Sequence, residues 1–303
     1  MSYINNNTYH INSLINNLSF KKAQKINIIM EGGLFNGSYL IGSLYYLKEL
    51  EKRKYIIINK FSGCSVGSLI PLIYFTNTYD LEHIIYKITY SHFKKKLNVN
   101  IFDKIFNRLR PFLTPEVMTE LNGRLYITFY DITQNRQIIK NKYESVDALF
   151  DTIRKSCYCP YVVDNSFLYR HKYVDGFYPY LFKEAVNIKN LYLNIHHFDK
   201  ILGIISIKNE KTNYSRIISG IIDTHTFFMY GSSTSMCSYI ENWNMFDTFS
   251  HFVFVRFLKI IPLLLHNIYI STRLIKTSTI IGPNIVFRIL RILYVYLIKK
   301  YCI

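Results

Sequence analysis

The chain has 303 residues, of which 50% are hydrophobic and 19% are charged. It is therefore long and apolar enough to bury a large core, which excludes a disordered chain and predicts one large globular domain, with or without an appendage. The formal net charge of +17 favours an anionic partner, either a nucleic acid or an anionic membrane surface.

The first 24 residues are polar and rich in Asn, and we interpret them as a lead-in to the domain. They contain no continuous apolar core, so they do not resemble a secretory signal. The five cysteines are scattered without paired spacing, which predicts neither a disulfide framework nor a structural zinc site. We therefore expect an intracellular protein, either cytoplasmic or peripherally bound to a membrane.

A glycine loop follows the first predicted strand. The apolar strand 26–30 leads into Glu31-Gly32-Gly33-Leu34-Phe35-Asn36-Gly37, and apolar residues then recur at helical spacing, with Ser38 expected to cap the helix. Free N–H groups at a helix start favour negative charge, so the loop is a candidate oxyanion site. The alternative is a tight connection without chemistry, while the absence of G-x-G-x-x-G spacing excludes a dinucleotide loop.

The next strand and helix enclose a second glycine-bounded turn. The strand 55–58 precedes Gly63-Cys64-Ser65-Val66-Gly67, and the apolar helix 69–73 follows. This order is typical of a nucleophile elbow, in which a sharp turn presents a serine hydroxyl at the end of a sheet. Ser65 is therefore the candidate nucleophile and the Val66 N–H a candidate oxyanion donor, unless the turn is only a glycine-rich loop.

The remaining elements alternate between helix and strand. We expect helices at 81–88, 101–109 and 146–153, a hairpin at 125–130 and 137–139, and strands or strand-like runs at 161–163, 167–169, 191–195 and 201–207. Such interleaving predicts an α/β fold with a central, mostly parallel sheet and helices on both faces.

A serine hydroxyl is a poor nucleophile at its ordinary pKa and needs a base within hydrogen-bond reach. Asp175 is the candidate, because it ends a short strand-like segment and Gly176 beside it permits a close approach. Two alternatives remain: Asp-Gly is also a common turn dipeptide, and a Ser/His/Asp triad is the nearest enzymatic rival. The histidines that such a triad would draw on are His196, His197, His225 and His266.

Four motifs together resemble the patatin-like phospholipases. They are the loop from Glu31 to Gly37, the G-x-S-x-G from Gly63 to Gly67, the Ser-x-x-x-Pro from Ser156 to Pro160, and the Asp175-Gly176 pair. The resemblance covers residues 25 to 207 and implies a Ser65/Asp175 dyad with an oxyanion hole made by the amides of Gly32, Gly33 and Leu34. It also implies hydrolysis of acyl esters in phospholipids or other lipids without calcium, another metal or a cofactor.

The chain departs from the pattern of that family at three positions. Leu34 stands where a third glycine is usual, Asn36 where a basic residue is usual, and Phe177 where a small residue is usual. These changes keep a second interpretation open, in which the protein has impaired catalysis and serves as a membrane-associated binding or scaffold protein.

The composition changes near the C-terminus. Residues 250–265 and 285–300 are apolar runs with scattered Arg and Lys, and the second run is too short and too charged for a confident transmembrane helix. We predict a lead-in at 1–24, a catalytic domain at 25–249 and a basic, hydrophobic helical extension at 250–303 that lies on a membrane or packs on the core. No nucleic acid is expected, because no recognised module accompanies the charge.

Overall fold

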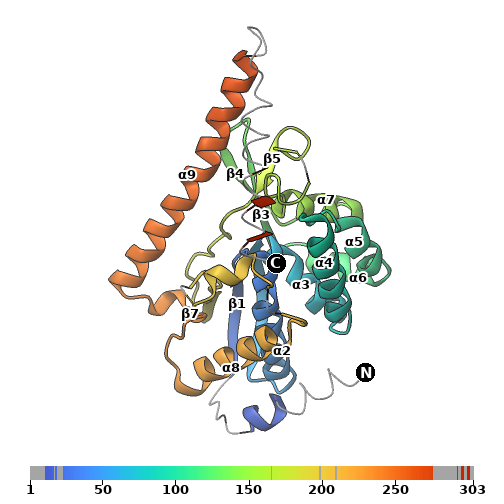
Figure 1. Cartoon of the computed structure of the whole chain (residues 1–303). Coiled ribbons are helices and arrows are strands. Elements are labelled where there is room, and N and C mark those ends of the chain that lie inside the picture. Colours follow the sequence, from blue (N-terminus) through green and yellow to red (C-terminus); the bar gives the residue numbers. More distant parts are fainter. Residues whose placement is uncertain are drawn as a thin grey trace.

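The computed structural model describes residues 11–16, 18, 23–164, 166–197, 199–208, 210–275, 292, 295–296 and 299–300. Within this part, seven strands form one mixed sheet (Figure 1). They are β1 (Gln24–Met30), β2 (Ile56–Cys64), β3 (Leu125–Asp131), β4 (Arg136–Lys140), β5 (Tyr173–Asp175), β6 (Ile188–Leu193) and β7 (Cys237–Tyr239).

The sheet order is β4-β3-β2-β1-β6-β7, and β5 pairs with β3 outside this path. The four central strands β3, β2, β1 and β6 run parallel, whereas β4, β5 and β7 pair antiparallel with their neighbours. The α/β class and the mostly parallel sheet are therefore confirmed.

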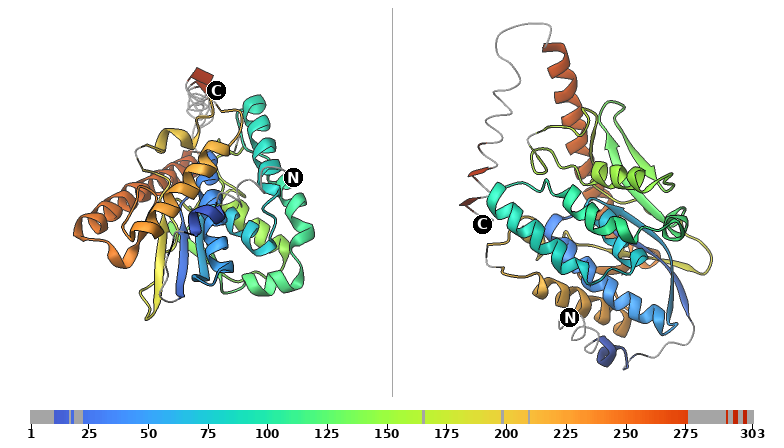
Figure 2. Two further views of the ribbon diagram at one scale, coloured as in Figure 1. Left: turned by 90° about the horizontal axis from the view of Figure 1, so that it is seen from below. Right: turned by 90° about the vertical axis from the view of Figure 1, so that its right-hand side faces the viewer.

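Helices flank this sheet. They are α2 (Gly37–Lys52), α3 (Val66–Thr76), α4 (Leu81–Lys96), α5 (Phe102–Leu109), α6 (Pro115–Leu121), α7 (Val146–Ser156), α8 (Tyr214–Tyr230) and α9 (Met245–Ile275). Short 3-10 turns lie at Leu34–Asn36, Arg110–Phe112, Ile201–Ile204 and Ile240–Asn242. The long helix α9 lies on the opposite side of the molecule from α4, α5 and α6 (Figures 1 and 2).

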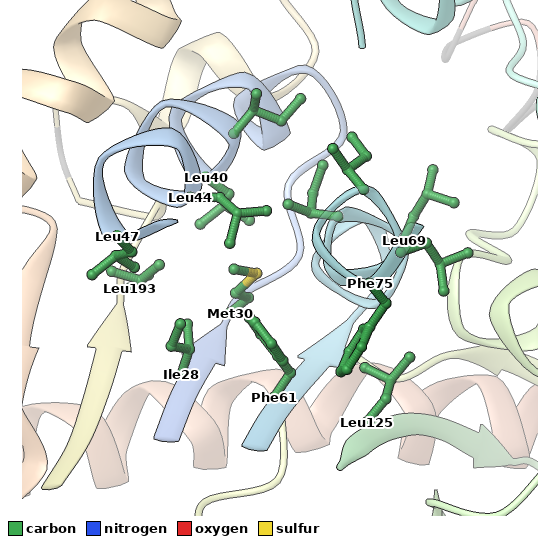
Figure 3. Close-up of a cluster of buried hydrophobic side chains, with 14 of the residues drawn as sticks. Ile28, Met30, Leu40, Leu44, Leu47, Phe61, Leu69, Phe75, Leu125 and Leu193 are labelled. Atoms are coloured by element: carbon green, nitrogen blue, oxygen red, sulfur yellow. The ribbon is translucent and has the colours of Figure 1, made fainter. Parts of the chain in front are cut away.

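The main core lies between the sheet and the helices α2 and α3 (Figure 3). Ile26, Ile28 and Met30 alternate along β1 and are fully buried there, because successive side chains of a strand point to opposite faces. The other face of the same strand carries Asn27, which donates a hydrogen bond to Asn190 of β6 at 2.8 Å.

Two glycines allow α2 and α8 to cross in backbone contact. A Cβ at Gly42 would lie 2.1 Å from the Ile217 carbonyl oxygen, and a Cβ at Gly220 would lie 2.1 Å from that of Tyr39. No side chain fits at either position, so this contact holds α8 directly against the helix that follows the glycine loop.

Several predicted elements are corrected. Residues 201–207 form no strand but begin with a 3-10 turn, because the carbonyls of Gly203 and Ser206 accept hydrogen bonds from Arg216 at 2.6 and 2.9 Å. The run 161–163 forms no strand, since Tyr161 takes a positive φ of 61°, and the run 167–169 is a bend that ends in an isolated bridge between Tyr169 and Tyr173. Ser38 does not cap α2, because the helix begins one residue earlier, at Gly37, and the Ser38 hydroxyl accepts from the Asn213 side chain. The sequence analysis missed α6, α8 and β7.

The C-terminal extension is described only in part. Helix α9 begins at Met245, before the predicted boundary at 250, and most of the second apolar run, 285–300, lies outside the described residues. By length and composition, Met245–Asn267 is a candidate membrane span with a mean hydropathy of 1.6. Only 6% of its apolar 18-residue stretch is buried.

Candidate active site

The register of β3 brings the two predicted reactive residues together. Cys64, the last residue of β2, pairs with Thr128, and Asp175, the last residue of β5, pairs with Phe129. Since β4 occupies the other edge of β3 along this stretch, β2 and β5 meet end to end on the same edge. Ser65 and Asp175 therefore lie side by side at the carboxyl end of β2.

Ser65 occupies a sharp and strained turn. Its φ of 52° and ψ of −132° lie outside the regions that residues with a side chain favour, at a cost of roughly 1–3 kcal/mol. The turn is tight enough that a Cβ at Gly63 would lie 2.0 Å from the Gly67 carbonyl oxygen, and one at Gly67 would lie 2.6 Å from that of Glu31. This is the geometry expected of a nucleophile elbow.

Asp175 is a buried carboxyl group that contacts the serine. It is 7% exposed, and its Oδ1 accepts from the Phe177 amide at 2.9 Å. Burial raises the pKa of Asp175 to about 6, against the opposing effects of the Phe177 amide and the Ser65 hydroxyl. Gly176 is required beside it, because a Cβ there would lie 2.3 Å from the Thr128 carbonyl oxygen.

The Ser-x-x-x-Pro segment ties these two turns together. The Ser156 hydroxyl accepts from the Ser65 amide at 2.9 Å, and its carbonyl accepts from the Gly176 amide at 3.3 Å. The Tyr158 carbonyl accepts from the Asp175 amide at 2.9 Å. The segment thus fixes the backbone of both reactive residues, a role that its sequence alone did not reveal.

The glycine loop lies against the elbow. A Cβ at Gly32 would lie 2.6 Å from the Ser65 Cβ, and one at Gly37 would lie 2.6 Å from Val66 Cγ2. The Gly32 amide opposes the rise that burial causes in the pKa of the Cys64 thiol. Among the described residues, the Gly32, Gly33 and Leu34 amides donate no hydrogen bond outside their own helical turn. These three amides, with that of Val66 at the start of α3, are the available oxyanion donors.

A second polar network, which the sequence analysis missed, supports the loop. Glu31 is 2% exposed, and its carboxylate accepts from the Ile195 amide at 3.0 Å, from the Tyr192 hydroxyl and from His196 Nδ1, which lies 2.7 Å away. Burial alone would raise the pKa of Glu31, but these bonds hold it below its ordinary value. Burial likewise opposes the charge on His196, yet the bond to Glu31 raises its pKa, and the imidazolium favours ionised Asp175.

In the described part of the chain, the histidines that a Ser/His/Asp triad would draw on form hydrogen bonds with groups outside the dyad. His196 bonds to Glu31 as above, and His197 Nδ1 lies 2.7 Å from the Asp199 carboxylate. His225 Nδ1 lies 2.9 Å from the Tyr46 hydroxyl, and His266 Nδ1 contacts the Ile132 carbonyl oxygen. None of these four side chains forms a hydrogen bond with Ser65 or Asp175.

The three departures from the motif have structural counterparts. Leu34 and Phe177 hold positive φ values of 39° and 60°, where a glycine would be unstrained. Asn36 is fully buried and donates to the carbonyls of Ile195 and Lys200, while its Oδ1 accepts from Arg216 at 2.7 Å. A buried guanidinium thus binds directly to position 36, where the motif usually has a basic residue.

An apolar cavity of about 120 Å³ opens beside Ser65. Its wall combines side chains from the glycine loop and from α3, α4 and α5, among them Leu34, Val66, Leu69, Ile85, Ile101 and Phe102. Polar wall groups are few, and they include Glu82 and Asn213. The cavity assembles from segments far apart in the chain, so no local pattern predicted it.

Among the described residues, no three His, Cys, Asp or Glu side chains are grouped as metal ligands would be. A comparison with protein-family models finds no match to the chain, and a comparison with curated proteins finds no significant similarity.

Proposed function

We propose that the protein is a lipid acyl hydrolase of the patatin-like type, which cleaves fatty-acyl esters of phospholipids or other lipids through a Ser65/Asp175 dyad. The observation that carries the proposal is the placement of the buried Asp175 carboxyl beside a serine held in a strained elbow. The apolar cavity beside Ser65 supports an acyl chain as the group transferred.

In the proposed mechanism, Asp175 accepts the hydroxyl proton as Ser65 Oγ bonds to the ester carbonyl carbon. The carbonyl oxygen becomes an oxyanion, for which the amides of Gly32, Gly33, Leu34 and Val66 are the hydrogen-bond donors. The bond to the leaving alkoxide then breaks, and Asp175 returns the proton to it, leaving an acyl-serine. Water attacks this ester by the same proton route and releases the fatty acid. A base with a pKa of about 6 is mostly ionised at neutral pH and suits this task.

The proposal is tested by labelling the purified full chain with a fluorophosphonate probe, which reacts with activated serines. We expect labelling that disappears in Ser65→Ala and falls by at least about a hundredfold in Asp175→Asn, since general-base assistance contributes about 10²–10⁴-fold. Ser68→Ala is the matched control, because it removes a second serine hydroxyl close to the elbow. That hydroxyl donates to the Ser65 carbonyl and has no role in the proposed mechanism, so labelling should persist. Folded protein that stays unlabelled in the presence of lipid micelles would overturn the hydrolase.

A second candidate function is that of a catalytically impaired, membrane-bound scaffold. The strained backbone at Leu34 and Phe177 favours this impaired scaffold, because both residues flank the reacting groups at positive φ. The exposed face of α9 is consistent with either candidate, since it presents Phe249, Phe252 and Phe257 to solvent. The labelling experiment separates the two, because only the hydrolase requires a reactive Ser65.

A further inference from the structure

The wall of the cavity beside Ser65 carries a carboxyl group that the proposed mechanism does not use. Glu82 lies in the first turn of α4, is 8% exposed and lines the cavity. Its Oε2 accepts from Asn213 Nδ2 at 2.8 Å, whereas Oε1 forms no hydrogen bond with any described residue.

This free oxygen faces open space. In the described part of the chain, two buried side-chain oxygens, Ser62 Oγ and the Tyr79 hydroxyl, have neither a hydrogen-bond partner nor accessible surface. Oε1 of Glu82 also lacks a partner but keeps accessible surface, and the Glu82 side chain lines the cavity. A carboxyl oxygen without a hydrogen-bond partner therefore lies at the wall of a mostly apolar chamber.

The neighbouring polar groups of the wall already have partners. The Thr89 hydroxyl donates to the Ile85 carbonyl at 2.8 Å, and the Tyr86 hydroxyl donates to Glu210 at 3.4 Å. The Ser38 hydroxyl accepts from Asn213 at 3.3 Å. Unlike these hydroxyls, Glu82 has an oxygen that forms no hydrogen bond with a described residue and can bind a ligand inside the cavity.

A hydroxyl group is the ligand chemistry that fits this oxygen best. Burial raises the pKa of Glu82 to about 7, although the Asn213 bond opposes the rise, so both protonation states are present near neutral pH. A hydroxyl donates to the carboxylate and accepts from the carboxylic acid, whereas a plain methylene chain would leave either form unpaired. An unpaired buried polar group is costly, so the cavity should discriminate between the two chains.

We propose that the cavity takes acyl chains that carry a hydroxyl group along their length, and that Glu82 selects them by binding this hydroxyl. The inference rests on the proposed function, in that the acyl group of the substrate enters the cavity beside Ser65.

The test compares nitrophenyl esters of octanoic acid with isomers that carry one hydroxyl at successive carbons. We expect at least one isomer to exceed the plain ester in kcat/KM by about tenfold with the native chain. Glu82→Leu should remove this preference and improve turnover of the plain ester, because the unpaired carboxyl is gone. Thr89→Val is the matched control, since its hydroxyl is already bonded to the backbone, and it should keep the preference.

The outcomes separate this inference from the proposed function. If the native chain hydrolyses the plain ester as fast as every hydroxylated isomer, the selection by Glu82 is wrong while the hydrolase stands. If no ester is hydrolysed, calorimetry with the neutral methyl amides of the same acids still decides the selection, using folded Ser65→Ala protein. Equal affinity for the plain and hydroxylated amides would then overturn it.

Discussion

At the scale of single residues, the site concentrates backbone strain. Ser65, Leu34 and Phe177 all carry side chains at positive φ, and each lies in a turn that meets the reacting atoms. For Ser65 the strain presents the hydroxyl at the end of the sheet, as an elbow requires. For Leu34 and Phe177 it is accompanied by apolar contacts with the neighbouring core clusters.

Asp175 sets the expected pH dependence. A general base must be ionised, and burial raises the pKa of this carboxyl above its ordinary value to about 6. Labelling and hydrolysis should therefore be low well below pH 6, rise as Asp175 loses its proton, and level off above it. The rate of probe labelling, measured across this range with the native chain, gives the midpoint.

Glu82 is the control for that assignment, because its pKa of about 7 lies close by. The Glu82→Gln variant removes this titration and should leave the midpoint near 6. If the midpoint disappears in Glu82→Gln, the rise in labelling rate is due to the titration of Glu82 in the cavity wall, which contradicts the role given to Asp175.

At the scale of elements, the turns that hold the reactive residues tolerate no added side chain. In Gly176→Ala, the new Cβ would lie 2.3 Å from the Thr128 carbonyl oxygen, so the backbone of Asp175 must shift. We expect a loss of about 1–3 kcal/mol in the free energy of unfolding and loss of probe labelling. Denaturant titration and labelling measure the two effects.

Gly231→Ala is the matched control. Gly231 ends α8 at a φ of 67°, and a Cβ there would have nothing within 4 Å. This variant should lose about 1 kcal/mol from backbone strain alone and keep full labelling. Equal labelling of both variants would mean that the position of Asp175 does not limit reactivity.

Helix α9 has an inner face that packs on the domain. His251 lies against Tyr192 and Trp243, with ring centroids 5.3 and 4.9 Å apart, and Phe254 lies 5.4 Å from His196. A helix with these contacts cannot be surrounded by lipid unless it leaves the sheet. We therefore expect α9 to lie along a membrane surface, with its exposed face toward the acyl chains.

The exposed face of α9 combines phenylalanines with cations. Phe249 and Phe257 are 62% and 63% exposed, and Arg256 lies over the Phe252 ring. In flotation with anionic vesicles, the native chain should bind, and Phe249→Gln/Phe257→Gln should weaken binding by at least about tenfold, because two apolar side chains no longer enter the interface. Added salt should weaken binding of the native chain.

The control pair for this experiment lies on α8, where Ile222 and Met229 are 52% and 48% exposed. Ile222→Gln/Met229→Gln should leave vesicle binding unchanged. If both pairs weaken binding equally, general surface hydrophobicity explains the association and α9 has no particular role in it.

At the scale of the whole molecule, the sequence predicted what depends on local pattern. The strand, glycine loop and helix around Gly32, and the elbow at Ser65, were recognisable because their residues are adjacent in the chain. The segment 201–207 was wrongly predicted as a strand, because its apolar run gives no sign that its carbonyls bind Arg216. The pairing of Glu31 with His196 and the cavity wall at Glu82 depend on contacts between distant segments, which periodicity cannot reveal.

The crossing of α2 and α8 determines where this chain can be shortened. All four recognisable motifs end by Gly176, yet Gly42 of α2 is covered by the backbone of Ile217, and Asn36 of the glycine loop binds Arg216. A fragment that stops at residue 207 would lose α8, leave a bare backbone groove along α2 and remove the Arg216 donor from Asn36 Oδ1. We therefore expect the smallest unit that folds by itself to extend beyond the last motif and to include α8.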